Sequence, residues 1–396
     1  MTEDTMGATD HRSNCTCGSC EGIFTGKRIN SQRRRLVSSI PAVFAAGMGV
    51  SLQNSANAQS RSASESKSTS KDQSDPIEVR RIDVHSHYLP ERYRQEAIAA
   101  GHQKPDGMPG LPKWSIETAL TAMDKFGIST SILSVSSPGV HFGQDLAAIK
   151  LARAVNEVGA HAVQTHPQRF GLFASLPLPN VDAALKEIEY ALDVLKADGI
   201  VMESNHHGVY PGDPRLDPVM EELNRRKAVL FLHPTSPDCP CCQETSLGYP
   251  RPMMEFMFET SRAVTNMILK GTLEKYPDIR LIIPHAGAMI PILVDRITGL
   301  SPALGLDAPL NTERVFSLLK RLHYDLAGFP IPRQLGALLQ IADEKHIMYG
   351  SDWPFTPDPV VAMLSKKIDE TDLLTDEQRI QILGRNALKL FPRLDS

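Results

Sequence analysis

Short runs rich in β-branched residues alternate with longer helical patterns from about residue 77 to the end of the chain, and this alternation most constrains the fold. Each run has the length and composition of a buried strand, and there are eight of them. The predicted strands are Arg81–His85, Thr130–Val135, Arg169–Ser175, Gly199–Met202, Ala228–Leu232, Arg280–Pro284, Leu322–Leu326 and His346–Tyr349.

The segments between these runs have the periodicity of amphipathic helices. Val181–Lys196 is a clear case, because its apolar residues recur at intervals of three and four. Glu377–Phe391 is a predicted closing helix. Eight strand–helix units in succession favour a single α/β domain, a (β/α)₈ barrel, over two doubly wound domains. The other predicted helices are Ile116–Phe126, Asp145–Gln164, Pro214–Arg226, Met253–Lys275 and Ile331–Asp343.

Composition narrows the class of protein further. Hydrophobic residues make up 41% of the 396 residues, which is enough for a real core and excludes a mostly disordered chain. The chain has 42 Lys and Arg against 46 Asp and Glu, and it has no dense basic stripe, so we expect no nucleic-acid partner. No apolar stretch approaches the ~18 residues of a membrane span.

The amino-terminal region has the pattern of an export signal. Arg33, Arg34 and Arg35 precede a mild apolar run, Leu36–Val50, and a small-x-small site at Ala56–Ala58. This order is typical of a twin-arginine signal peptide. Alternatives are a core helix and a transit peptide; the run is short for a spanning helix, and nearby acidic residues argue against a transit peptide.

We therefore expect three parts in the chain. Residues 1–58 are a predicted signal peptide, residues 59–76 a Ser-rich disordered linker, and residues 77–396 the barrel. The mature protein would be periplasmic, without a membrane attachment after the signal is removed. Six cysteines are too few for a disulfide scaffold. The cluster Cys239, Cys241 and Cys242 lacks the second half of a usual zinc motif, and its role stays open.

Candidate metal ligands follow four of the predicted strands. In a (β/α)₈ barrel the chemistry lies at the carboxyl ends of the strands. His85 and His87 end the first strand, and strand alternation places both on one face. His233 ends the fifth strand, His285 the sixth and Asp352 the eighth. A lone histidine is more often a hydrogen-bonded structural residue, but five such residues at one end of a barrel favour a catalytic divalent metal.

The remaining polar positions predict the number of ions. In two-metal sites of such barrels, a lysine at the end of the fourth strand forms a carbamate that bridges the ions. Here the fourth strand ends near Glu203 and has no lysine, so we expect one ion. Glu203 is a weak candidate to replace that lysine. The other histidines do not share the strand-end placement and are interpreted as structural: His161, His166, His206, His207 and His323. Of these, His206 and His207 lie on the functional rim after the fourth strand.

The sequence around these site residues resembles that of the amidohydrolase superfamily, in particular its branch of decarboxylases related to the aminocarboxymuconate-semialdehyde enzyme. Two stretches, Ser131–Gly139 and Tyr190–Gly199, look most like the 6-methylsalicylate decarboxylases. The matching motifs are Asp83–His87, Met123–Gly127, His166–Phe170, Leu232–Pro234, His285–Gly287, Gly350–Pro354 and Asn386-Ala387. One departure is Ala119–Ala122, where the muconate enzyme has an arginine, and this disfavours a muconate substrate.

The resemblance implies a role for each site residue. His85, His87, His233 and Asp352 would bind one divalent ion, zinc or, as the alternative, manganese. His285 would stay unligated and hydrogen-bond the metal-bound water or the substrate. The chemistry of decarboxylation also needs a proton on the ring carbon, and we expect Asp352 to deliver it while His285 handles the hydroxyl proton.

The resemblance also implies the reaction and the assembly. The reaction is the non-oxidative decarboxylation of a small hydroxyaromatic or unsaturated carboxylic acid, with hydrolysis of a lactone, ester or amide as the alternative. Arg296 would hold the substrate carboxylate of a neighbouring subunit in a homodimer, although an ordinary ion pair of Arg296 with Asp295 or Asp325 is equally compatible with the sequence.

Overall fold

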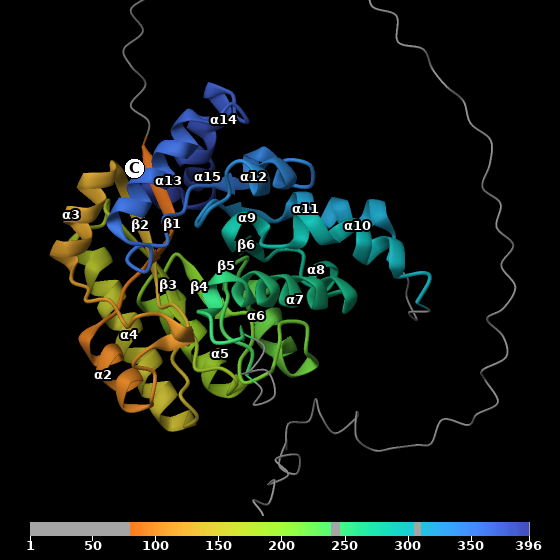
Figure 1. Ribbon diagram of the computed structural model, residues 1–396. Helices are drawn as coiled ribbons and strands as arrows, with labels where there is room; N and C mark the ends of the chain where they lie inside the picture. The colour runs from red at the N-terminus through yellow and green to blue at the C-terminus, as the bar shows by residue number, and fades with distance from the viewer. Residues whose placement is uncertain (1–79, 239–245, 305–309, 396) are drawn as a thin grey trace, which may run out of the picture. The chain divides into compact units, whose positions relative to one another are not determined.

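The strands of the computed structural model form one parallel sheet in the order of the chain, β1 to β8 (Figure 1). The structure describes residues 80–238, 246–304 and 310–395. All eight predicted strands are present, which confirms the (β/α)₈ class. Their bounds are β1 Arg81–His87, β2 Ile128–Ser134, β3 Phe170–Ser175, β4 Gly199–Glu203, β5 Val229–His233, β6 Arg280–Ile283, β7 His323–Asp325 and β8 Ile347–Met348.

The ring closes where β1 meets β8 and the residues that follow it. Tyr349 accepts a backbone hydrogen bond from Val84 at 3.0 Å, and Trp353 accepts one from His87 at 2.7 Å. Isolated bridges join Asp83 to Tyr349 and Ser86 to Trp353. Because β8 itself has only two residues, the seam depends on this following segment.

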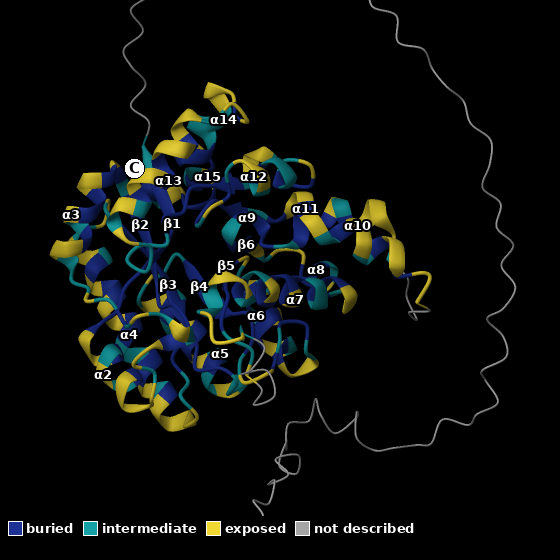
Figure 2. Cartoon of the chain, in the orientation of Figure 1, coloured by how far each residue is buried: buried dark blue, intermediate teal, exposed yellow. Residues whose placement is uncertain are grey.

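Helices surround the ring, with their outer faces exposed and the strands buried (Figure 2). Within the described residues, no helix combines the length and the apolar character needed to cross a membrane. The helices are α2 Glu91–Ala99, α3 Ile116–Phe126, α4 Asp145–Thr165, α5 Val181–Glu189, α6 Asp217–Arg225, α7 Glu255–Leu269, α8 Thr272–Lys275, α9 Pro284–Gly287, α10 Ile290–Leu300, α11 Thr312–Arg321, α12 Arg333–Leu338, α13 Asp358–Glu370, α14 Asp376–Ile380 and α15 Asn386–Leu390.

Several predicted helices are longer than those observed. The predicted helix Val181–Lys196 is observed as α5, which is followed by a π-helical turn, Tyr190–Val194. The predicted helix 253–275 is divided into α7 and α8 at Gly271, whose left-handed backbone (φ +69°) ends α7. The predicted helix 331–343 is reduced to α12. The predicted closing helix is interrupted between α14 and α15 by a π-helical turn, Gln381–Arg385.

The interior of the barrel is filled by apolar side chains toward the amino-terminal ends of the strands. Phe173 and Phe231 stack inside the ring, with centroids 5.3 Å apart. The carboxyl-terminal segment covers this end, and the ring centroid of Phe391 lies 5.9 Å from that of Phe173. The strand and tail residues of this cluster are Ile82, Val84, Ile132, Phe173, Val201, Val229, Phe231, Ile282, Met348, Ala387, Leu390, Phe391 and Leu394.

Candidate metal centre

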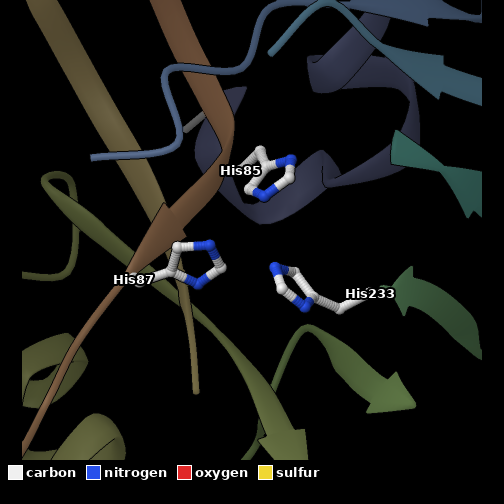
Figure 3. A group of neighbouring side chains, drawn as sticks. All are labelled: His85, His87 and His233. Atoms are coloured by element: carbon white, nitrogen blue, oxygen red, sulfur yellow. The ribbon is translucent and has the colours of Figure 1, made fainter. Parts of the chain in front are cut away.

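The five predicted site residues meet at the carboxyl ends of the strands. His85 and His87 end β1, His233 ends β5, His285 follows β6, and Asp352 follows β8. The ring centroid of His85 lies 5.0 Å from that of His87, 5.0 Å from that of His285 and 5.5 Å from that of His233. Figure 3 shows the rings of His85, His87 and His233 gathered around one space.

The donor atoms in this cluster fit a divalent ion. His85, His87 and His233 each offer a ring nitrogen, and these nitrogens lie within 4.8 Å of one another. Asp352 Oδ1 lies 3.1 Å from His87 Nε2 and 3.6 Å from His85 Nε2. His85 Nε2 is buried without a hydrogen-bond partner among the described residues. Three imidazoles and one carboxylate are a donor set suited to a borderline ion such as zinc.

The outward nitrogens of the two β1 histidines are held by residues at the ends of β7 and β2. His85 Nδ1 lies 2.9 Å from Asp325 Oδ2, and His87 Nδ1 lies 3.1 Å from Ser134 Oγ. Asp325 is fully buried at the end of β7, and its Oδ1 accepts the backbone N–H of His285 at 3.0 Å. Asp325 therefore aligns two site residues, a role that the sequence analysis missed. An acidic residue ending the seventh strand was the available signal.

Burial and charge set the protonation of the cluster. Burial lowers the pKa of His85, but the carboxylates of Asp325, Asp352 and Asp83 outweigh it and raise that pKa to about 9. Burial would raise the pKa of Asp352, yet its contacts with the site histidines hold it well below the ordinary value. Burial lowers the pKa of His233. A carboxylate and a neutral imidazole are the forms in which these side chains bind metal.

The backbone at the site adopts left-handed conformations. His285 (φ +54°), Ala286 (φ +52°) and Asp352 (φ +58°) have positive φ without being glycine. Gln334 on α12 donates to the carbonyl oxygens of His285 at 2.5 Å and of Ala288 at 2.9 Å, and so holds the turn after β6. Non-glycine residues in this region cost about 1–3 kcal/mol each and cluster at functional sites. The strain here accompanies the placement of His285, whose Nε2 lies 3.9 Å from Asp352 Oδ2.

A cavity of about 450 Å³ lies beside the cluster, and Ser175, Glu203 and Thr235 from the ends of β3, β4 and β5 line it. This volume is in the range of small-molecule sites. On its rim, His141 Nδ1 lies 2.8 Å from His207 Nε2. His141 was not singled out from the sequence, and His207 was interpreted as structural. Each of these histidines also contacts a carboxylate: His141 Nε2 lies 3.0 Å from Asp145 Oδ1, and His207 Nδ1 lies 2.6 Å from Asp238 Oδ2.

Arg296 lies apart from these contacts. It is exposed on α10 and makes no ion pair with any described residue. Asp325, one of its expected alternative partners, is instead paired with His85. The predicted signal peptide, the linker and the cysteine cluster Cys239, Cys241 and Cys242 lie outside the described residues.

Comparison with known proteins adds the family context. The amidohydrolase family model matches residues 82–393. Over 318 residues the chain is 35% identical to 6-methylsalicylic acid decarboxylase of Penicillium expansum, covering 79% of this chain and 97% of that one. It is 28% identical over 288 residues to gamma-resorcylate decarboxylase of a Rhizobium species, covering 69% and 86%.

Solved structures support the same fold. A crystal structure of an amidohydrolase superposes with a TM-score of 0.74 at 37% identity, covering 80% of this chain and all of that one. The 5-carboxyvanillate decarboxylase of Novosphingobium aromaticivorans, solved with manganese, superposes with a TM-score of 0.70 at 21% identity, covering 79% and 96%. At that identity the second likeness bears on the fold alone.

Proposed function

This chain belongs to the amidohydrolase family, and on that premise we propose that it is a metal-dependent decarboxylase of a small hydroxyaromatic carboxylic acid. The observation that carries the proposal is its 35% identity to a 6-methylsalicylic acid decarboxylase over 97% of that enzyme. The five-residue centre supports it, since every residue that the resemblance requires is present and the five lie together.

The chemistry needs a group that stabilises charge and a group that delivers a proton. Loss of CO₂ from an aromatic acid leaves an electron pair on a ring carbon, and that carbon must gain a proton. A bound divalent ion supplies positive charge that orients the acid and stabilises developing negative charge. Asp352 is a carboxylate in the resting protein, so it must first receive a proton before it can give one to the ring. Among the described residues, His285, whose Nε2 lies 3.9 Å from Asp352 Oδ2, is placed to supply that proton.

We propose zinc as the ion, because three nitrogen donors and one oxygen donor suit it, with manganese as the alternative. The test is metal analysis of the purified protein, followed by reloading with either ion and a CO₂-release screen over hydroxybenzoates. We expect one ion per chain and CO₂ release from at least one ortho-hydroxy acid. Turnover of lactones, esters or amides without CO₂ release would instead identify a hydrolase.

We also propose that the protein works as a homodimer in which Arg296 acts across the interface. Arg296 is exposed and without an ion pair among the described residues, and two apolar side chains on α10 are exposed too, Ile292 at 58% and Leu300 at 37%. Arg296→Ala should raise KM with metal content unchanged. Mixing Arg296→Ala with His285→Asn subunits should restore about a quarter of wild-type activity, because half of the dimers then hold one complete site. Inactive mixtures whose subunits demonstrably exchange would refute the arrangement.

Finally, we propose export by the twin-arginine route, on the pattern of residues 31–58. The mature protein should begin near Gln59. Replacing Arg33 and Arg34 with lysine should retain the protein in the cytoplasm, as measured by cell fractionation. Normal export of the double variant would contradict the route.

A further inference from the structure

The third metal-binding histidine differs from the other two in what holds its outward nitrogen. His85 Nδ1 and His87 Nδ1 have close partners at 2.9 and 3.1 Å. His233 Nδ1 is buried and has no hydrogen-bond partner among the described residues. It faces Glu203 Oε2 at 3.4 Å, and that oxygen is also buried without a partner. Two complementary polar groups therefore lie 3.4 Å apart without forming a hydrogen bond.

We propose that Glu203 is the positioning residue of His233, and that it accepts a hydrogen bond from His233 Nδ1–H when His233 Nε2 binds the ion. The inference rests on the proposed metal centre and not on the reaction that the centre carries out. A neutral imidazole that binds metal through Nε2 must carry its proton on Nδ1, and that N–H needs an acceptor.

The fold fixes the two side chains as neighbours. Glu203 ends β4 and His233 ends β5, and the two residues are paired in the parallel register. The backbone N–H of Ser204 donates to His233 O at 2.7 Å, directly beside this pair. Both side chains are at least nine-tenths buried, so water cannot replace the missing hydrogen bond freely. A buried donor left unpaired destabilises the fold, which favours closing the gap between the two atoms.

The loop after β2 passes close to the Glu203 side chain. Gly139 has a left-handed backbone (φ +73°), and a Cβ there would lie 3.2 Å from Glu203 Cγ and 3.3 Å from Oε1. Ser136 Oγ, the other polar group near His233, lies 3.5 Å from Nε2 and therefore on the inward side. Among the contacts of His233 with the described residues, Glu203 is the acceptor on the outward side.

The experiment measures metal affinity, by competition with a chromophoric chelator for Zn²⁺, in Glu203→Ala and Glu203→Gln. Glu203→Ala should bind zinc ~10–100-fold more weakly, the usual cost of losing such a partner. Glu203→Gln should keep most of the affinity, because its amide oxygen still accepts a hydrogen bond. Ser175→Ala is the matched control: Ser175 Oγ is buried, unpartnered and lines the same cavity, but no contact joins it to the histidines. Its zinc affinity should be unchanged.

A second readout covers the case in which Glu203→Ala fails to fold. In ¹⁵N-histidine NMR spectra of the zinc-loaded wild-type protein, His233, assigned through its through-space contacts with neighbouring residues, should be protonated at Nδ1. An unprotonated Nδ1 in this spectrum overturns the proposal. Wild-type zinc affinity in folded Glu203→Ala also overturns it, because Glu203 would then face only the cavity and not support His233. Glutamate-dependent zinc binding without any CO₂ release would refute the proposed decarboxylase and leave this inference standing.

Discussion

The two ends of the barrel are built on opposite principles. At the amino-terminal end, Phe391 and Leu394 from the tail pack into an apolar cluster with the strand residues, and Arg393 pairs with Asp198 at 2.6 Å. At the carboxyl end, the side chains of the site are polar, and His85, His233 and His285 each hold a buried nitrogen without a hydrogen-bond partner among the described residues. Apolar burial stabilises a fold, whereas unpaired buried polar atoms cost stability. The comparison indicates that one end supplies the stability and the other uses part of it to preform the metal site.

The largest expected effect comes from removing a ligand at the polar end. His233→Ala should lose bound metal, and turnover should fall by ~10³-fold or more, because the charge stabilisation from the ion is lost. Elemental analysis and CO₂ release measure the two effects. His161→Ala, which removes an exposed histidine on α4, is the control and should keep both. Full metal occupancy in His233→Ala would refute its assignment as a ligand.

Next in size is a change at the apolar end. Phe391→Ala should lower the free energy of unfolding by about 3–5 kcal/mol, because it opens a cavity under the barrel. Phe391 is 3% exposed and contacts Phe173. Metal content of the folded protein should not change. Chemical denaturation and elemental analysis check this, and loss of metal without loss of stability would show that the two ends are not separable.

A smaller effect is expected where a residue serves the reaction and not the ion. His285→Asn should retain near-normal metal content and lose turnover by ~10²-fold or more, as for a proton-handling group. Parallel measurements of metal and of kcat separate these outcomes. Loss of the metal along with activity would place His285 among the ligands.

The smallest effect concerns proton release on metal binding. The pKa of His85 in the metal-free protein is raised to about 9, so at neutral pH the ion must displace a proton from this ring. Zinc affinity should therefore rise up to ~10-fold per pH unit from pH 7 and level off near pH 9. Chelator competition at several pH values tests this. A pH-independent affinity over that range would mean that His85 is already neutral.

Local patterns in the sequence were sufficient for the parts of the molecule that repeat. The eight strands were predicted because each is a short apolar run between helical patterns, and the five site residues because each directly follows such a run. The helix bounds were less well predicted. The break at Gly271 and the π-helical turn before α15 depend on single residues that periodicity does not weigh.

The supporting residues could not be assigned from local patterns. Asp325 acts through His85, which lies 240 positions earlier in the chain, and Ser134 acts through His87, 47 positions earlier. The role proposed for Glu203 likewise depends on the register between β4 and β5. Such roles follow from which strand ends are neighbours, and a sequence without a structure does not fix those distances.

The seam of the ring has a consequence for the order of events during synthesis. Asp352 approaches His85 and His87 only through the segment that joins β8 to β1, and its backbone N–H donates to His85 O at 2.8 Å. The two β1 histidines leave the ribosome early, whereas Asp352 is among the last 45 residues. A growing chain therefore carries two of the proposed ligands for most of translation without the carboxylate that completes the proposed set. Loading with metal becomes a late step, and a ribosome-bound chain truncated before residue 352 is an incomplete competitor for the ion.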